Sequence, residues 1–183
     1  MLLQSKTGRP RVLAVLVCCL LSYACAPVSS TRSEEMESRT LQPLPGVNPI
    51  DVKVTVYGEN VGGFASHYYP LPREDFENAL LKSMVDSGRF VIKSNNGETA
   101  YDISVGLIQL IQPQWSGTVT LETSWTVYDH RSKDEVSRRA IRVEKPASFT
   151  RKREATELAA QSTIVEGIEW TFKTIKENSQ NSD

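Results

Sequence analysis

Residues 119–127 read Val-Thr-Leu-Glu-Thr-Ser-Trp-Thr-Val, a stretch in which apolar and polar side chains alternate. This period of two predicts a β-strand with one buried face, and Trp125 lies on the apolar side. The polar residues 129–134 follow, so we predict a hairpin turn there. Ile141 and Val143 belong to the partner strand, whose exposed positions carry Arg138, Arg139 and Arg142.

Three further strands are predicted on the N-terminal side of this hairpin. Val52, Val54 and Val56 alternate with polar residues, and residues 90–92 form a short apolar run. A third strand follows from residue 103, and its apolar side switches at Ile108 and Leu110. Such a switch indicates a β-bulge or a change of the strand from edge to core.

Two helices complete the predicted set of elements. The first follows Pro72 and ends near Gly88, with its apolar face formed by Phe76, Leu80, Leu81, Met84 and Val85. The second covers about residues 151–177, with one apolar stripe of Leu158, Ile164, Val165, Ile168, Phe172 and Ile175. The order β-α-β-β-β-β-α predicts an α+β fold, with an antiparallel-rich sheet of about five strands and two helices packed on one face.

The N-terminus has the composition of a secretory signal. Residues 1–11 hold three positive charges and no negative one, residues 12–21 are apolar, and Ala24 precedes Cys25. This pattern resembles a bacterial lipoprotein signal, which implies cleavage after Ala24 and diacylation of Cys25. The family favours leucine where Ser22 stands. An ordinary signal peptide with an incidental cysteine and an uncleaved membrane anchor are the alternatives.

These features divide the chain into four parts. Residues 1–24 are the predicted signal peptide, and residues 25–49 are a lipidated cysteine followed by a polar, proline-containing segment that we interpret as a flexible tether. Residues 50–178 form one periplasmic α+β domain, and residues 179–183 a disordered tail. Ala26 stands where aspartate marks retention in the inner membrane of many bacteria, so the resemblance implies the outer membrane, on its periplasmic face.

The composition argues against several kinds of chemistry. All three cysteines lie within residues 18–25, so no thiol remains in the domain, and the two histidines occupy different loops. We therefore expect no catalytic residue, no metal and no cofactor. The net charge of −1 offers no basic surplus for nucleic acid.

The domain resembles a group of predicted bacterial lipoproteins of unknown function. The matching positions, in the same order over most of residues 50–176, are Asp75–Leu80, Ser83, Gly88, Gln112-Pro113, Thr118–Asp129, Leu158-Ala159, Ile164, Glu166 and Ile168. The sequence departs from the group at residues 160–162, where Asn-Glu-Gly is frequent, and at Val165, where arginine is. The resemblance implies an envelope lipoprotein and supplies no catalytic residue.

Two places are candidates for binding. The loop 58–70 is rich in glycine and aromatic residues, and Phe64, His67, Tyr68 and Tyr69 are its candidate contacts. Trp115 lies in a second loop, between Pro113 and Gly117. In both loops the aromatic rings alternatively pack onto the core.

These observations favour a non-enzymatic accessory protein, anchored in the membrane by lipid and bound to an envelope protein complex for lipid transport or surface-polymer assembly. A periplasmic carrier of lipid or small ligands is the alternative, and an enzyme a distant third.

Overall fold

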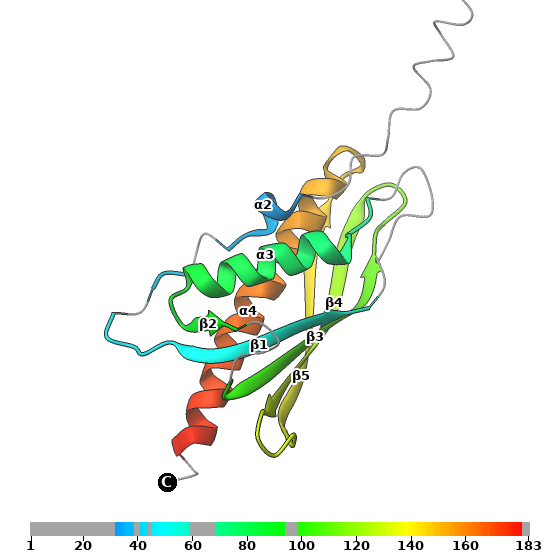
Figure 1. Ribbon diagram of the computed structural model, residues 1–183. Helices are drawn as coiled ribbons and strands as arrows, with labels where there is room; N and C mark the ends of the chain where they lie inside the picture. The colour runs from blue at the N-terminus through cyan, green and yellow to red at the C-terminus, as the bar shows by residue number, and fades with distance from the viewer. Residues whose placement is uncertain (1–31, 39–40, 44, 59–68, 94–98, 181–183) are drawn as a thin grey trace, which may run out of the picture.

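The computed structural model describes residues 32–38, 41–43, 45–58, 69–93 and 99–180. Its elements follow the chain in Figure 1 as α2 (Ser33–Met36), β1 (Ile50–Tyr57), α3 (Arg73–Asp86), β2 (Phe90–Ile92), β3 (Tyr101–Ile111), β4 (Gly117–Asp129), β5 (Glu135–Ala147), the 3-10 turn η2 (Phe149–Arg151) and α4 (Lys152–Gln180). The predicted α+β fold, with its five strands and two long helices in this order, is confirmed. No helix among the described residues is long and apolar enough to cross a membrane.

The five strands form one sheet in the order β2-β1-β3-β4-β5. Strand β1 pairs in parallel with both β2 and β3, whereas the β3–β4 and β4–β5 pairs are antiparallel. The sheet is therefore mixed, and half of its strand pairs are parallel. The cause is α3, which carries the chain back along the sheet between β1 and β2, as a parallel connection requires.

The connections along the antiparallel half agree with the sequence patterns. The register of β3 against β4 shifts between Leu107 and Gln109, which confirms the predicted bulge. In the β4–β5 hairpin, the Asp129 amide donates to the Asp134 carbonyl at 3.0 Å, and Lys133 adopts a φ of 63°. The Asp129 carboxylate accepts hydrogen bonds from two amides of the turn, those of Arg131 and Ser132.

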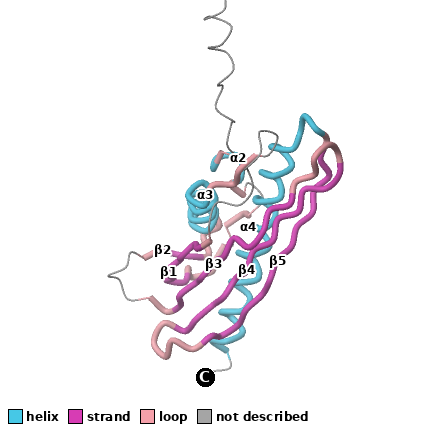
Figure 2. Tube along the Cα trace, turned by 90° about the vertical axis from the view of Figure 1, so that its right-hand side faces the viewer, coloured by secondary structure: helices cyan, strands magenta, loops and turns pink. Residues whose placement is uncertain are grey.

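The helices cover the apolar face of the sheet. Helix α3 contacts β1 and β2, and α4 runs along β4 and β5, as Figure 2 shows from the side. Trp125 is fully buried between β4 and α4, and its indole N–H donates to Thr123 Oγ1 at 2.9 Å. The ring lies against the backbone of Gly167, so that α4 approaches the sheet most closely where it has no side chain.

The buried face of α4 includes four residues of the predicted stripe, Ile164, Ile168, Phe172 and Ile175, but not Leu158. Leu158 is 44% exposed, whereas small residues occupy the buried positions of the same turns. At Gly167 the Trp125 ring fills the space between the layers, so a residue without a side chain faces the sheet there. The buried residues include Ala155, Ala159, Ala160, Thr163, Ile164, Gly167, Ile168, Thr171, Phe172 and Ile175. On α3, Val85 is likewise exposed rather than buried.

The segment before β1 packs on the domain. We name residues 32–38 the N-terminal strap; it contains α2 and contacts both α3 and α4. Met36 is fully buried and Leu41 nearly so. The described residues of 25–49 thus depart from the prediction of a flexible tether, because Met36 and Leu41 add to the core at its edge.

Candidate functional site

The upper end of the molecule in Figure 1 brings together the strap, the β3–β4 connection and the start of α4. A buried amide, that of Gln112, joins three segments there. Its Nε2 donates to the Tyr69 carbonyl at 2.8 Å and to Thr156 Oγ1 at 2.9 Å, and its Oε1 accepts from the Tyr69 amide at 2.9 Å. Tyr69 is held through its backbone at the base of the connection that carries Trp115. Gln112 is therefore structural.

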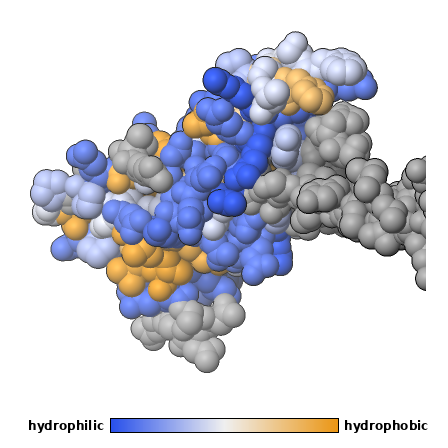
Figure 3. All heavy atoms as spheres, turned by 90° about the horizontal axis from the view of Figure 1, so that it is seen from above, coloured by the Kyte–Doolittle hydropathy of each residue, from blue (hydrophilic) through white to orange (hydrophobic). Residues whose placement is uncertain are grey.

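Two aromatic side chains protrude from this end. Trp115 is 68% exposed and Phe149, in η2, is 53% exposed. Their rings stack with centroids 5.8 Å apart and planes 29° apart. We name this pair the aromatic tip. Viewed from this end, the surface is mainly hydrophilic, and hydrophobic side chains gather in separate patches (Figure 3).

The aromatic tip rests on a buried lysine. The Lys152 side chain is fully buried at the start of α4, and its ammonium lies 5.1 Å from the centroid of the Phe149 ring. The same Nζ donates a hydrogen bond to the Gln114 carbonyl, one residue before Trp115. Lys152 thus ties both halves of the tip to the helix, by a charge-assisted hydrogen bond and a cation–π contact.

The strap is fastened to the same turns of α4 by charged groups. Glu157 accepts hydrogen bonds from the Arg32 amide at 3.3 Å and from Arg153 Nε at 2.8 Å. Arg153 also lies 3.7 Å from the Glu35 carboxylate. These contacts fix the start of the strap within two turns of the beginning of α4.

Further contacts fasten the C-terminal part of the strap. The Ser38 amide donates to Ser83 Oγ on α3 at 2.8 Å, and Gln161 Nε2 on α4 donates to the Glu37 carbonyl at 2.7 Å. Lys82 and Glu37 form an ion pair at 2.5 Å. The strap therefore bridges α3 and α4, and its own Met36 side chain is buried between it and the domain.

Burial raises the pKa of Glu157, and a hydrogen bond with Glu35 raises it further; the Arg153 guanidinium and the Arg32 amide act in the opposite direction. A carboxyl whose pKa is raised on folding binds its proton more tightly in the folded state. Its contribution to stability is complete below the unfolded value of 4.5 and is lost as the pH rises through the folded value.

Wild-type protein is consequently expected to gain stability relative to Glu157→Gln as the pH falls from 7 to 4.5, because glutamine cannot take up the proton. Urea unfolding of both proteins at several pH values measures the difference. Glu154→Gln, which removes an exposed carboxylate one turn earlier, is the matched control. If the free energies of unfolding of wild type and Glu157→Gln differ by the same amount at every pH in this range, the pKa of Glu157 is not raised on folding.

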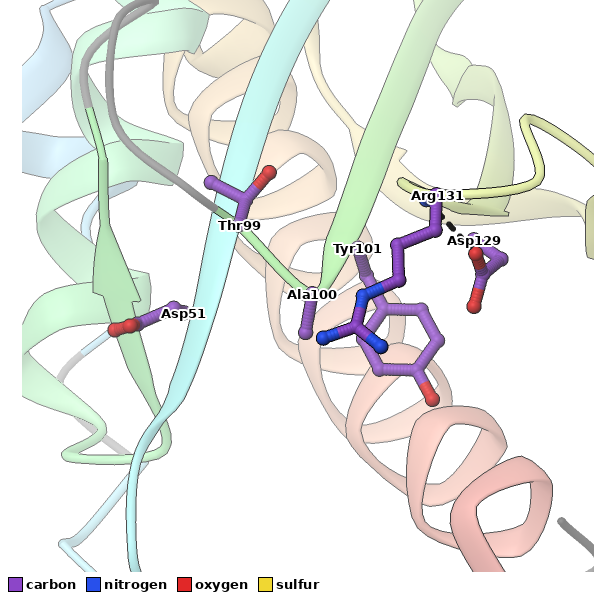
Figure 4. A pocket seen from close by; sticks show the side chains of 6 residues that line it. All are labelled: Asp51, Thr99, Ala100, Tyr101, Asp129 and Arg131. Atoms are coloured by element: carbon purple, nitrogen blue, oxygen red, sulfur yellow. Dashed lines mark hydrogen bonds between the residues drawn. The ribbon is translucent and has the colours of Figure 1, made fainter.

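A pocket of about 330 Å³ lies at the opposite end of the sheet, lined by Asp51, Thr99, Ala100, Tyr101, Asp129 and Arg131. In Figure 4 the carboxylates of Asp51 and Asp129 lie on opposite sides of it. Across the described ranges, no three side chains of the metal-ligating types group into a metal site.

A charged cluster lies beside this pocket. Asp102 Oδ1 is 2.8 Å from His130 Nδ1, and Asp102 Oδ2 is 3.2 Å from Lys133 Nζ. Burial alone would raise the pKa of Asp102, but the hydrogen bonds from His130 and Lys133 outweigh it and lower the pKa below its ordinary value. The cluster joins the start of β3 to the hairpin turn and so stabilises that end of the sheet.

The structure places two of the predicted binding residues at the upper end. Trp115 is exposed as part of the aromatic tip, and Tyr69 is half-buried and held by Gln112. Ala24, Cys25, Phe64, His67 and Tyr68 lie outside the described residues. Sequence reasoning missed Phe149, Lys152 and the strap, although an aromatic residue within the polar run before α4 was a usable signal for Phe149.

Comparison with known proteins supports the fold. No family model matches the chain, and no curated protein does. A Xanthomonas campestris protein of the DUF330 family is similar in structure, with a TM-score of 0.61 and 15% identity over 79% of this chain and 97% of that one. The protein CT253 of Chlamydia trachomatis is similar at a TM-score of 0.54, with 8% identity over 69% of this chain and 98% of that one.

A minor lipoprotein from Acinetobacter baumannii aligns at a TM-score of 0.44, with 10% identity over 70% of this chain and 94% of that one. At these identities the likeness is one of fold. The chain therefore shares its α+β architecture with the Xanthomonas campestris and Chlamydia trachomatis proteins.

Proposed function

We propose that this protein is a lipid-anchored, non-enzymatic accessory protein of the bacterial cell envelope, attached through Cys25 to the outer membrane and facing the periplasm. The position of the strap carries the proposal. Arg32 is fastened to α4 only seven residues after Cys25, and seven residues span at most about 25 Å. An acylated Cys25 would hold the domain close to the bilayer, with the start of α4 nearest to it.

The signal-like N-terminus supports the same proposal. A positive segment, an apolar run of ten residues and a small residue before Cys25 suit export and acylation. Two or more acyl chains anchor a protein stably, because each buried CH₂ contributes about 0.8 kcal/mol. The domain would then present its surface to a protein complex of the envelope.

A carrier that opens between its helices gains no support from the described residues. The strap crosses from α3 to α4, and Met36 is fully buried beneath it. A lipid chain entering there would have to displace Met36 and the hydrogen bonds at Ser38 and Glu37. Native mass spectrometry of the purified protein distinguishes the two functions, because a carrier retains a bound lipid besides the anchor.

Metabolic labelling with a fatty acid tests the anchor. We expect wild-type protein to take up the label and Cys25→Ser to lose it. Cys18→Ser and Cys19→Ser are matched controls that remove a thiol from the same region and should keep the label. Label persisting in Cys25→Ser, or absent from wild type, would sink the proposal.

A further inference from the structure

The two rings of the aromatic tip are mostly exposed to solvent and are not part of the hydrophobic core. Trp115 has the most exposed large hydrophobic side chain of the residues that the structure describes, and the Phe149 ring beside it is more than half exposed. Both belong to connections, which usually carry polar side chains. Large exposed apolar groups held next to each other mark a contact with another apolar body.

The tip is held in place rather than loosely attached. The stacked rings come from segments 34 residues apart in the sequence, the β3–β4 connection and η2. Lys152 links them, through its hydrogen bond to the Gln114 carbonyl and its contact with Phe149. A surface fixed in this way loses little conformational entropy when it binds.

The tip lies at the end of the domain to which the strap is fastened. Phe149 comes three residues before Lys152, and Arg32 contacts Glu157, five residues after it. Those five residues of helix span about 8 Å. The whole of helix α4 runs about 43 Å, from this end to the other, where the β4–β5 turn carries charged side chains. The end that bears the aromatic tip is therefore also the end at which Arg32, seven residues after Cys25 in the sequence, is fastened.

We propose that Trp115 and Phe149 enter the interfacial layer of the lipid bilayer to which Cys25 anchors the protein, so that the aromatic tip acts as a second membrane contact. This inference rests on the proposed function. Tryptophan suits that layer because its ring is apolar and its N–H can donate to headgroups or water. Arg151, in the same turn η2 as Phe149, has a side chain that is 75% exposed and 3.9 Å from Glu154, and its guanidinium suits the phosphate groups of the same layer.

Fluorescence quenching by brominated lipids tests the contact. Lipidated protein, processed so that it begins at Cys25, is reconstituted into phosphatidylcholine vesicles with and without brominated acyl chains, and tryptophan emission is compared. We expect bromine to quench wild-type protein, because Trp115 would lie within the bilayer interface. Trp115→Phe should lose most of this quenching, whereas Trp170→Phe should keep it, since Trp170 is partly buried against the core.

Flotation of the same vesicles separates the two proposals. Wild type, Trp115→Phe and Trp170→Phe should all float with the lipid, held by the anchor, and Cys25→Ser should not. Wild type that floats without quenching overturns the membrane contact of the tip and leaves the anchor standing. Quenching that persists in Trp115→Phe also overturns it. Wild type that fails to float overturns the anchor, and the inference with it.

Discussion

Replacing Gly167 by alanine is expected to destabilise the domain by about 1–3 kcal/mol, although alanine is the better helix former. A Cβ at this position would overlap the Cζ2, Cε2 and Cη2 atoms of the Trp125 ring. The ring has no room to withdraw, because it is fully buried and its N–H is bound to Thr123. Helix and sheet would have to separate, and the contacts on either side would weaken. Gly167→Val is expected to prevent folding.

The direction of the stability change in Gly167→Ala tests whether α4 approaches the sheet closely at this position. In an open position, glycine to alanine within a helix gains up to about 1 kcal/mol. A Gly167→Ala protein that unfolds at a higher urea concentration than wild type would therefore contradict the close approach of α4 to the sheet. The double variant Gly167→Ala with Trp125→Leu is the matched control, since a smaller side chain at 125 should reduce the cost of the added methyl group.

Trp125→Ala is expected to cost about 3–5 kcal/mol, because it removes a fully buried aromatic ring and leaves a cavity between β4 and α4. Domains of this kind are stable by only about 5–15 kcal/mol, so the variant should be marginally folded. Circular dichroism during urea unfolding measures the loss.

Trp170→Ala is the control for the loss of an indole ring. Trp170 lies on α4 and is only partly buried against the core, so its removal should cost much less than that of Trp125. Equal losses at the two positions would show that the sheet register or the rotation of α4 differs from the structure described.

The strands and helices could be predicted from sequence because their apolar periods are local. Residues 119–127 carry a period of two, and the residues from Phe76 to Met84 a period near 3.6. The rotation of α4 could not be predicted in the same way. Periodicity gives weight to large apolar residues such as Leu158, whereas the buried face also contains Ala160, Thr163 and Gly167, and the absence of a side chain at Gly167 matters because it lies opposite Trp125.

The parallel pairs were also beyond local patterns. Strands next to one another in sequence suggest hairpins, and the β3–β4–β5 segment follows that rule. The placement of β1 between β2 and β3 depends on how α3 crosses the sheet, which no single segment of sequence encodes.

Only part of the candidate site could be predicted from the sequence. Trp115 stood out because a tryptophan between Pro113 and Gly117 is unusual for a connection. The strap did not, since Ser33–Met36 has the composition of a linker and gains its order from partners such as Glu157, 125 residues away from Arg32. Contacts of that range leave no local signature.

The central position of β1 has a consequence for folding kinetics. The antiparallel β3–β4–β5 meander has low contact order and can form from its own contiguous residues. Strand β1 gains its second neighbour only when it pairs with β3, which begins 44 residues after Tyr57, the last residue of β1, and follows a helical crossover. Helix α4, which covers Trp125, follows every strand. A nucleus in the meander would therefore expose its apolar face until α4 docks, and β1 and the strap would join on the native side of the rate-limiting barrier.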